Sequence, residues 1–294
     1  ADQWKSTLET YAYPVFGKYP VSQIDTALIL KVLEPIWTTK TETARRVLNR
    51  IGKILDYAKV QKYRTGENPA TWRGHLEHSL PNPSKLIKVE HHPALPYKKI
   101  GAFMRDLRQR TGPAATMLEV TILSALRSNE PRLATWGEID LKAGLWTIPG
   151  ARMKMGEEHV VPLTPRLLEI FTKLRAAAGE VKDDTFVFPG PKPGTPFSNA
   201  AMLALLKRMG HTDIVTHGFR STFRTWASDC TAFPSEVCEK ALAHKVGNKV
   251  QEAYDRAAML DKRRQLMTAW ENFCNTVIEE NVDNVIPMKG TTAA

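Results

Sequence analysis

Residues 145–163 read LWTIPGARMKMGEEHVVPL, and along this stretch the periodicity of the chain changes from helical to extended. Two short apolar runs, 145–149 and 159–163, flank a polar turn at 154–158, a pattern typical of two antiparallel strands joined as a hairpin. Before and after the hairpin, apolar residues recur at intervals of three and four, which predicts helices. We therefore expect a mainly α protein with a small antiparallel β-sheet.

The helical pattern also predicts how the chain divides into domains. It runs from Trp4 to Tyr63 and is clearest at 44–58, but it fails between Gly66 and Pro96, where prolines and glycines favour a linker. Helical patterns then resume and continue, apart from the hairpin, towards position 280. We predict two domains, with these boundaries: a helical domain at 1–80, a linker at 81–96, a second domain at 97–280 and a disordered tail at 281–294.

Positive charge predominates in the chain. Its 294 residues include 41 Lys and Arg against 31 Asp and Glu, a formal net charge of +10. Such an excess favours a polyanionic partner through long-range attraction and counterion release, with nucleic acid as the first candidate and an anionic membrane as the second. The polar face of the predicted helix around 44–58 is either a solvated surface or a DNA contact, and its basic side chains include Lys40, Arg45, Arg46, Arg50 and Lys53.

Several classes of protein are disfavoured by what the sequence lacks. No run approaches the roughly 18 apolar residues of a membrane span, and the first residues have no signal-peptide core. The three cysteines have no C-x-x-C spacing, so the sequence suggests neither a disulfide framework nor a zinc site. We expect a soluble protein of the bacterial cytoplasm, associated with the nucleoid. The chain begins with Ala1 rather than Met, which suggests a piece of a longer protein.

Two cationic residues of the second domain are candidates for binding phosphate. Arg127 follows an apolar helical run, and the carboxylate of Glu130, three residues later, can hold its guanidinium in place. The pair can equally be a structural ion pair. Lys154 is predicted near the tip of the hairpin, where a lysine is ordinarily a solvent-facing residue.

Three further segments follow towards the C-terminus. His217 and Arg220 enter a predicted helix three residues apart, so they can share a face and converge on an anion near the helix N-terminus. His217 can equally be a packing residue. His244 ends a Leu-Ala-His string, and Tyr254 lies ten residues later; a tyrosine in such a segment is by itself more often half-buried core.

Taken together, these groups occur in an order that resembles the active-site signature of the tyrosine recombinases: Arg127, Lys154, His217, Arg220, His244 and Tyr254. The strings LAH at 242–244 and AYDR at 253–256, with RRQLM at 263–267, are most similar to the phage P4-type integrases of genomic islands. The resemblance covers nearly the whole chain. It implies a helical core-type DNA-binding domain followed by a tyrosine-recombinase catalytic domain.

The resemblance also implies a role for each residue. Tyr254 is the nucleophile, Arg127 and Arg220 hold the phosphate, Lys154 is the general acid, His217 and His244 are supporting donors or proton carriers, and Glu130 supports Arg127. Two departures concern local backbone shape: Ser124-Ala125 stands where Thr-Gly is common, and Pro131 follows Glu130 in a segment usually read as helix.

The implied function is site-specific DNA recombination, the integration or excision of a mobile element through a 3′-phosphotyrosine intermediate. Because the phosphotyrosine ester conserves the energy of the broken bond, no ATP is expected, and the sequence has no G-x-x-x-x-G-K-[ST] loop. It also has no H-E-x-x-H motif or evident carboxylate cluster, so we predict a mechanism without metal or other cofactor.

The family resemblance further implies partners: double-stranded DNA at attachment sites, a tetramer on that DNA, an accessory DNA-bending or directionality factor, and no membrane. It implies a missing N-terminal arm-binding domain as well. Two other readings remain open, a type IB topoisomerase-like enzyme with closely similar residues and a non-catalytic DNA-binding protein. The intact candidate set speaks against the second, because binding alone does not require a phenol at position 254.

Overall fold

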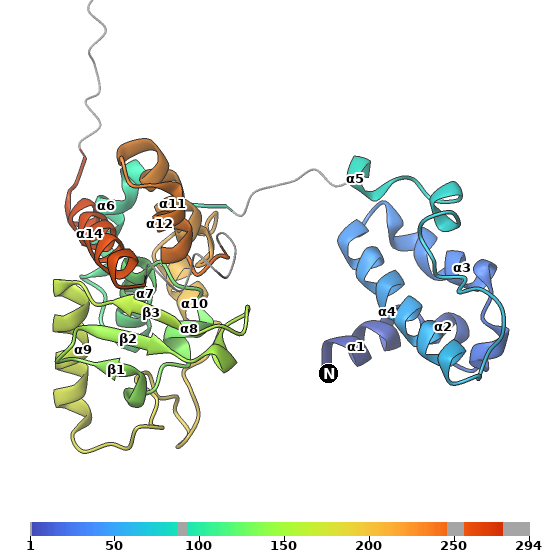
Figure 1. The fold of residues 1–294 in the computed structure, drawn as a ribbon, viewed down its shortest axis with the longest axis horizontal. Helices are drawn as coiled ribbons and strands as arrows, with labels where there is room; N and C mark the ends of the chain where they lie inside the picture. Colours follow the sequence, from blue (N-terminus) through green and yellow to red (C-terminus); the bar gives the residue numbers. More distant parts are fainter. Residues whose placement is uncertain (1, 87–92, 246–255, 279–294) are drawn as a thin grey trace, which may run out of the picture. The chain divides into compact units, whose positions relative to one another are not determined.

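The computed structural model describes residues 2–86, 93–245 and 256–278. The chain divides into two compact units, unit 1 at Ala1–Glu90 and unit 2 at His91–Ala294, each with its own hydrophobic core (Figure 1). In the described part of the chain, no helix is both long and apolar enough to cross a membrane. The mainly α fold with a small antiparallel sheet is confirmed.

The regular elements of unit 1 in its described residues are all helices. Its elements are α1 (Asp2–Tyr11), α2 (Tyr13–Phe16), the 3-10 turn η1 (Val21–Gln23), α3 (Thr26–Trp37), α4 (Thr41–Val60), η2 (Leu76–His78) and α5 (Pro83–Leu86). The side chain of Asp25 caps α3 by accepting a hydrogen bond from the Leu28 amide at 2.9 Å, which satisfies one of the free N–H groups of the first turn.

Helix α4 carries the apolar stripe that the sequence predicts. Ala44, Val47, Ile51 and Leu55 are buried in the core of unit 1 at three- and four-residue intervals, as one face of an amphipathic helix requires. Ile54, which lies within the predicted apolar stretch at 44–58, is instead 39% exposed.

The segment after α4 corrects the interpretation of Gly66–Pro96 as linker. Leu76 and Leu80 are buried in the core of unit 1, and the Trp37 indole donates a hydrogen bond to the Pro81 carbonyl at 2.8 Å. Prolines and glycines end the helical periodicity here without removing the segment from the core. Positions 87–92 lie outside the described residues, and the boundaries of the linker at 81–96 stay a prediction.

Unit 2 places a three-stranded sheet among helices. Its first half comprises η3 (Tyr97–Lys99), α6 (Ile100–Leu107), α7 (Pro113–Ser124), α8 (Asn129–Arg132), η4 (Trp136–Glu138), β1 (Ile139–Asp140), β2 (Leu145–Ile148), η5 (Gly150–Arg152) and β3 (His159–Pro162). The helices α9 (Pro165–Ala178), α10 (Ala201–Arg208), α11 (Gly218–Cys230), α12 (Ser235–Ala241) and α14 (Arg256–Asn275) follow.

The sheet has the order β1-β2-β3 with antiparallel pairs, and the predicted hairpin is its β2–β3 pair (Figure 1). In register, Trp146 pairs with Val161 and Ile148 with His159. All four side chains are buried, and the Trp146 ring packs edge-on against Phe171 of α9 with their centroids 5.6 Å apart. The strands therefore present one apolar face to the core, while the connection at 149–158 extends beyond it.

Helices α7 and α14 form the centre of unit 2. Almost the whole circumference of α7 is buried, as its apolar sequence predicts for a central helix. From α14, Leu266, Met267 and Trp270 pack into the same core, and the Trp270 indole donates to the Ile122 carbonyl of α7 at 2.9 Å. The helix ends at Asn275, five residues before the predicted end at 280.

Candidate active site

Arg127 is held at the end of α7 by Glu130. One Glu130 carboxylate oxygen accepts a hydrogen bond from the Arg127 backbone amide, and the other forms an ion pair with the guanidinium at 3.2 Å. Glu130 is almost fully buried, whereas the Arg127 side chain keeps 22% of its surface exposed. The carboxylate thus fixes both the backbone and the side chain of Arg127, and part of the guanidinium remains accessible.

The two local departures from the recombinase pattern have a structural explanation. Ala125 ends α7 in the left-handed conformation, with φ of 52°, where glycine would avoid the steric cost of a Cβ. Pro131 lies in the first turn of α8, where no intrahelical partner exists for a backbone N–H and proline is tolerated. Both departures are therefore compatible with the position of Arg127.

Arg220 joins three separate segments of unit 2. It lies in the first turn of α11 and is 5% exposed. Its guanidinium donates to the carbonyl of Ala125, two residues before Arg127, and to that of Leu242 at 2.6 Å. The Arg220 Nη2 atom also lies 3.1 Å from Nε2 of His244. The structure thereby brings the Arg127 loop, Arg220 and His244 together.

The positive charge of this cluster is incompletely neutralised. Burial and, to a smaller extent, the nearby charge of Arg127 lower the pKa of Arg220 to about 10, while the carboxylates of Glu130 and Glu239 act in the opposite direction. Among the described residues, three of the five guanidinium N–H donors have partners. A buried arginine in this state is suited to bind an anion.

Glu239 is a contact of His244 that the sequence did not single out. Its carboxylate lies 2.6 Å from Nδ1 of His244 and 2.6 Å from Nε of Arg224 on α11. Burial would raise the pKa of Glu239, but the hydrogen bonds from His244 and Arg224 outweigh it and hold the pKa below its ordinary value. The two residues are five apart across the end of a short helix, a spacing that no helical period brings together.

Lys154 is exposed on the connection between β2 and β3. No hydrogen bond or ion pair joins it to another described residue. Arg152, two residues before it, anchors this connection: its guanidinium pairs with Glu138 and donates to the Glu130 carbonyl at 2.5 Å. The base of the Lys154 loop is therefore tied to the residue that holds Arg127.

His217 precedes the first residue of α11 and is exposed. The next residue, Gly218, has no room for a side chain, because a Cβ there would lie 2.3 Å from the Pro93 carbonyl oxygen. His217 and Arg220 therefore enter α11 from a turn packed closely on the chain at Pro93. His217 is on the surface and Arg220 beneath it, so the two side chains occupy different depths of the same helix start.

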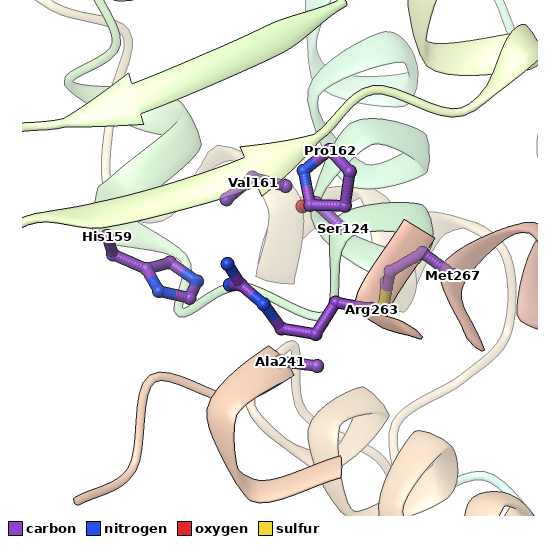
Figure 2. A pocket seen from close by; sticks show the side chains of 7 residues that line it. All are labelled: Ser124, His159, Val161, Pro162, Ala241, Arg263 and Met267. Carbon is purple, nitrogen blue, oxygen red and sulfur yellow. The ribbon is translucent and has the colours of Figure 1, made fainter. Parts of the chain in front are cut away.

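A buried histidine, His159, lies beside the guanidinium of Arg263 (Figure 2). Burial lowers the pKa of His159 to about 3, and the positive charges of Arg263, Arg220 and Arg127 contribute, while a hydrogen bond to the Ala241 backbone acts in the opposite direction. Sequence reasoning read His159 only as the first residue of a strand. In the structure it pairs with the buried Ile148, which places both side chains on the core face of the sheet.

Tyr254 lies outside the described residues. Helix α14, which begins two residues later, is anchored within its own unit: Arg263 donates to the Val160 carbonyl at 2.8 Å, and the buried Glu271 accepts hydrogen bonds from the Thr164 hydroxyl and the Arg166 amide. Residues 260–273 therefore pack within their own unit.

The basic residues predicted to contact DNA line α4 in unit 1. Arg45 pairs with Glu42, whereas Arg50 is half-buried and donates to the Gln3 carbonyl of α1 at 2.8 Å. Arg50 and Lys53 both lie over the Trp4 ring, and Lys40 lies over Tyr11. Part of this basic face therefore also joins α1 to α4, and its contact with DNA stays a prediction.

Both units match models of known protein families. The model of the phage integrase central domain matches residues 1–75, and that of the phage integrase family matches 96–260. This chain belongs to the phage integrase family. The members of this family are tyrosine recombinases, so the family predicted from the order of the motifs is confirmed. The predicted similarity to P4-type integrases is confirmed as well.

Individual relatives agree with this assignment. The chain is 32% identical to the prophage integrase IntZ of Escherichia coli K12 over 98% of this chain and 69% of the relative. It is 29% identical to the integrase of Enterobacteria phage P4 over 90% of this chain and 63% of that protein. The chain thus spans about two thirds of the length of these relatives.

The fold of this recombinase is shared with a solved structure of lambda integrase, a tetramer bound to a Holliday junction. The TM-score is 0.60 over 89% of this chain and 71% of that chain, at 14% sequence identity. At this identity the likeness concerns the fold. It shows that the helical unit and the unit with the small sheet occur together in a phage integrase.

Proposed function

We propose that this chain cuts and rejoins DNA at the attachment sites of a mobile element, with Tyr254 as the nucleophile. The observation that carries the proposal is the convergence of Arg127, Arg220 and His244, which come from three distant segments of a unit that matches the phage integrase family. A pair of guanidiniums offers several preorganised hydrogen bonds to the phosphate oxygens that gain negative charge in the transition state.

The reaction balances without a cofactor. The phenolic oxygen of Tyr254 attacks phosphorus, and the phenolic proton passes to His244 or His217. The bond from phosphorus to the 5′ oxygen breaks, and Lys154 donates a proton to this leaving oxygen. The exposed loop that carries Lys154 allows it to reach this oxygen once DNA is bound. Attack of a 5′ hydroxyl on the 3′-phosphotyrosine reverses these steps and rejoins the strand.

The proposal extends to the assembly. Double-stranded DNA is the substrate, the basic face of α4 contacts its backbone, and four copies act together on two attachment sites in the bacterial nucleoid. The net charge of +10 and the exposed side chains of Arg45, Arg46 and Lys53 support an electrostatic contact with DNA. An accessory DNA-bending or directionality factor belongs to the same proposal.

The test is covalent capture on a nicked duplex that spans the junction of the element and its host genome, in EDTA and without ATP. The parent protein and a Tyr63→Phe variant, which lacks an exposed tyrosine of unit 1, should form an adduct that survives SDS, whereas Tyr254→Phe should form none. Tight binding of the duplex without an adduct would contradict the proposal and favour a non-catalytic DNA-binding protein.

A plasmid assay separates recombination from simple relaxation of supercoils. A topoisomerase-like enzyme should relax plasmids whether or not they carry an attachment site. A recombinase should join two plasmids only when both carry one. Relaxation of site-free plasmids at the same rate would favour the topoisomerase reading.

A further inference from the structure

The loop after α12 holds the imidazole of His244 between one donor and one acceptor. The His244 backbone amide donates to the Glu239 carbonyl at 2.9 Å, and Ala243 adopts the left-handed conformation with φ of 51°, a common way to end a helix. This turn brings the His244 ring back towards the side chain of Glu239. Arg220 approaches the ring from the other side.

The chemistry of these neighbours specifies the tautomer of the ring. A guanidinium has only donors, so Nε2 of His244, 3.1 Å from Arg220, must accept. The single N–H of the neutral imidazole is then on Nδ1, where it donates to the Glu239 carboxylate at 2.6 Å. Nε2 is left as the basic atom on the side of the arginine cluster.

We propose that Glu239 is a positioning residue for the strand-cleavage reaction: it holds the proton of neutral His244 on Nδ1 and stabilises the imidazolium that forms when Nε2 gives up the hydrogen bond from Arg220 and takes up a proton. The carboxylate stays ionised, and the Nδ1 proton stays on the ring. The arrangement has the same physical logic as the carboxylate that orients a catalytic histidine in a hydrolase triad. This inference rests on the proposed role of His244 in cleavage.

Glu239 also has a structural contact, with Arg224, which must be tested separately from its contact with His244. Its second oxygen accepts from Arg224, whose guanidinium also donates to the Ser235 hydroxyl at 3.1 Å, so Glu239 joins α12 to α11. Arg224→Met removes this connection and leaves the His244 contact in place. It is therefore the matched control for Glu239→Gln.

The Glu239→Gln substitution tests the tautomer because the amide has one acceptor and one donor group. Arg224 and Nδ1–H of His244 both need an acceptor, and the single amide oxygen cannot face both. When the oxygen faces Arg224, the NH₂ group faces Nδ1 and forces the ring proton to Nε2, towards Arg220. The variant therefore preserves shape but disfavours the required tautomer.

The first experiment measures the imidazole nitrogen shifts of the DNA-free protein by NMR, with His244→Gln used to assign the signals. In the parent and in Arg224→Met, neutral His244 should be protonated on Nδ1, and in Glu239→Gln this preference should be lost. Protonation on Nε2 in the parent would overturn the inference. This result does not depend on whether the protein cleaves DNA.

The second experiment measures single-turnover adduct formation on the nicked duplex, well below the unfolding temperature of each variant. Glu239→Gln should slow cleavage about 10- to 100-fold, as expected when the orienting partner of a functional histidine is altered. Arg224→Met should slow cleavage less than about threefold. In a His244→Gln background, Glu239→Gln should have little further effect on the rate, because the effects of coupled residues are not additive. Equal effects of Glu239→Gln and Arg224→Met, or full additivity with His244→Gln, would overturn the inference. An inactive parent would instead count against the proposed function.

Discussion

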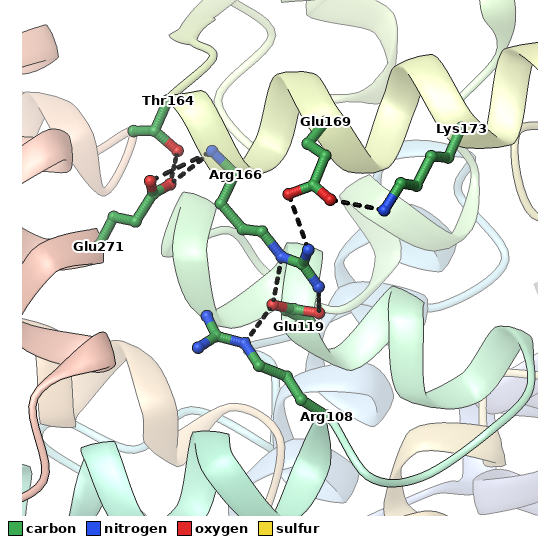
Figure 3. A network of polar contacts seen from close by, with 7 residues as sticks. All are labelled: Arg108, Glu119, Thr164, Arg166, Glu169, Lys173 and Glu271. Carbon is green, nitrogen blue, oxygen red and sulfur yellow. Dashed lines mark hydrogen bonds and ion pairs between the residues drawn. The ribbon is translucent and has the colours of Figure 1, made fainter.

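Unit 2 contains two pairs of arginines close to buried carboxylates, and they differ in how completely their charge is neutralised. In the first, Arg108 and Arg166 both bind Glu119, which is 5% exposed and accepts three hydrogen bonds at 2.7–3.1 Å (Figure 3). In the second, Arg127 is paired with Glu130, but Arg220 bonds to two backbone carbonyls and a histidine.

The difference appears in the pKa values of the arginines. The hydrogen bonds from Arg166 to Glu119, aided by Glu169, raise the pKa of Arg166 above its ordinary value. Burial and the charge of Arg127 instead lower the pKa of Arg220. The first pair is satisfied within the protein and joins α6, α7 and α9, whereas the second keeps binding capacity for an anion. Residue type alone does not separate a structural arginine from one available to a ligand; the neighbouring carboxylates do.

The largest expected effect is on catalysis at the second pair. Arg220→Lys should slow adduct formation by about 10²- to 10³-fold, the loss expected when one preorganised donor to a transition-state oxyanion is removed. Lysine keeps the charge but cannot reproduce the planar set of N–H donors. Single-turnover cleavage measures the effect. Arg166→Lys is the control and should cleave within about threefold of the parent while folded; a comparable loss there would remove the distinction between the pairs.

The next effect is on stability at the first pair. Glu119→Gln should lower the free energy of unfolding by about 3 kcal/mol, because two arginines lose their buried counter-charge. Urea unfolding measures the change. Glu157→Gln removes an ion pair with Lys245 in which both side chains are about half exposed, and should cost no more than about 0.5 kcal/mol. Similar losses in the two variants would show that Glu119 acts as an ordinary surface partner.

The two pairs also show which part of the site could be predicted from sequence. Arg127 and Arg220 were found because their order with His244 and Tyr254 matches a family signature. Glu119 was missed because it lies inside an apolar run, and its partners are 11 residues before it and 47 after it. An ion network assembled over such separations leaves no local pattern.

The fold was predictable wherever periodicity reports burial, as in α4 and the β2–β3 hairpin. Periodicity gave no signal where irregular backbone is buried: residues 66–80 contain the core side chains Leu76 and Leu80, but their turns and short 3-10 helix follow no period. Glu239 was overlooked for a related reason. Its contact with His244 depends on the left-handed turn at Ala243, and alanine gives no sequence signal for that conformation.

A smaller effect concerns pH and follows from the burial of His159 beside Arg263, with Arg220 and Arg127 nearby. His159 has a pKa of about 3 in the folded protein and an ordinary value of 6.5 when unfolded. As pH falls through 6.5, the unfolded chain binds a proton that the folded protein does not, so stability decreases down to about pH 3. Between pH 7 and pH 5 this contributes a loss of about 2 kcal/mol.

Comparing variants isolates this contribution from that of other titrating groups. Urea unfolding at the two pH values should show a smaller loss in His159→Gln than in the parent. His78→Gln, at a side chain with 76% exposure, should leave the parent's loss unchanged. If His159→Gln retains the full pH dependence, His159 is protonated in the folded state and the cationic surroundings inferred for it are wrong.

The smallest effect tests the connection between the second pair and the Lys154 loop. Arg152→Lys retains one contact with Glu138 but loses the geometry to reach the Glu130 carbonyl as well, so the base of the loop loosens beside Arg127. We expect cleavage to slow about tenfold, equivalent to about 1.4 kcal/mol in the barrier, with DNA affinity unchanged because Arg152 is turned into the protein. Single-turnover rates and equilibrium binding of the same duplex separate the two outcomes. If affinity falls and the bound complex cleaves at the parental rate, Arg152 contacts DNA, and the anchoring of Lys154 must come from the strands alone.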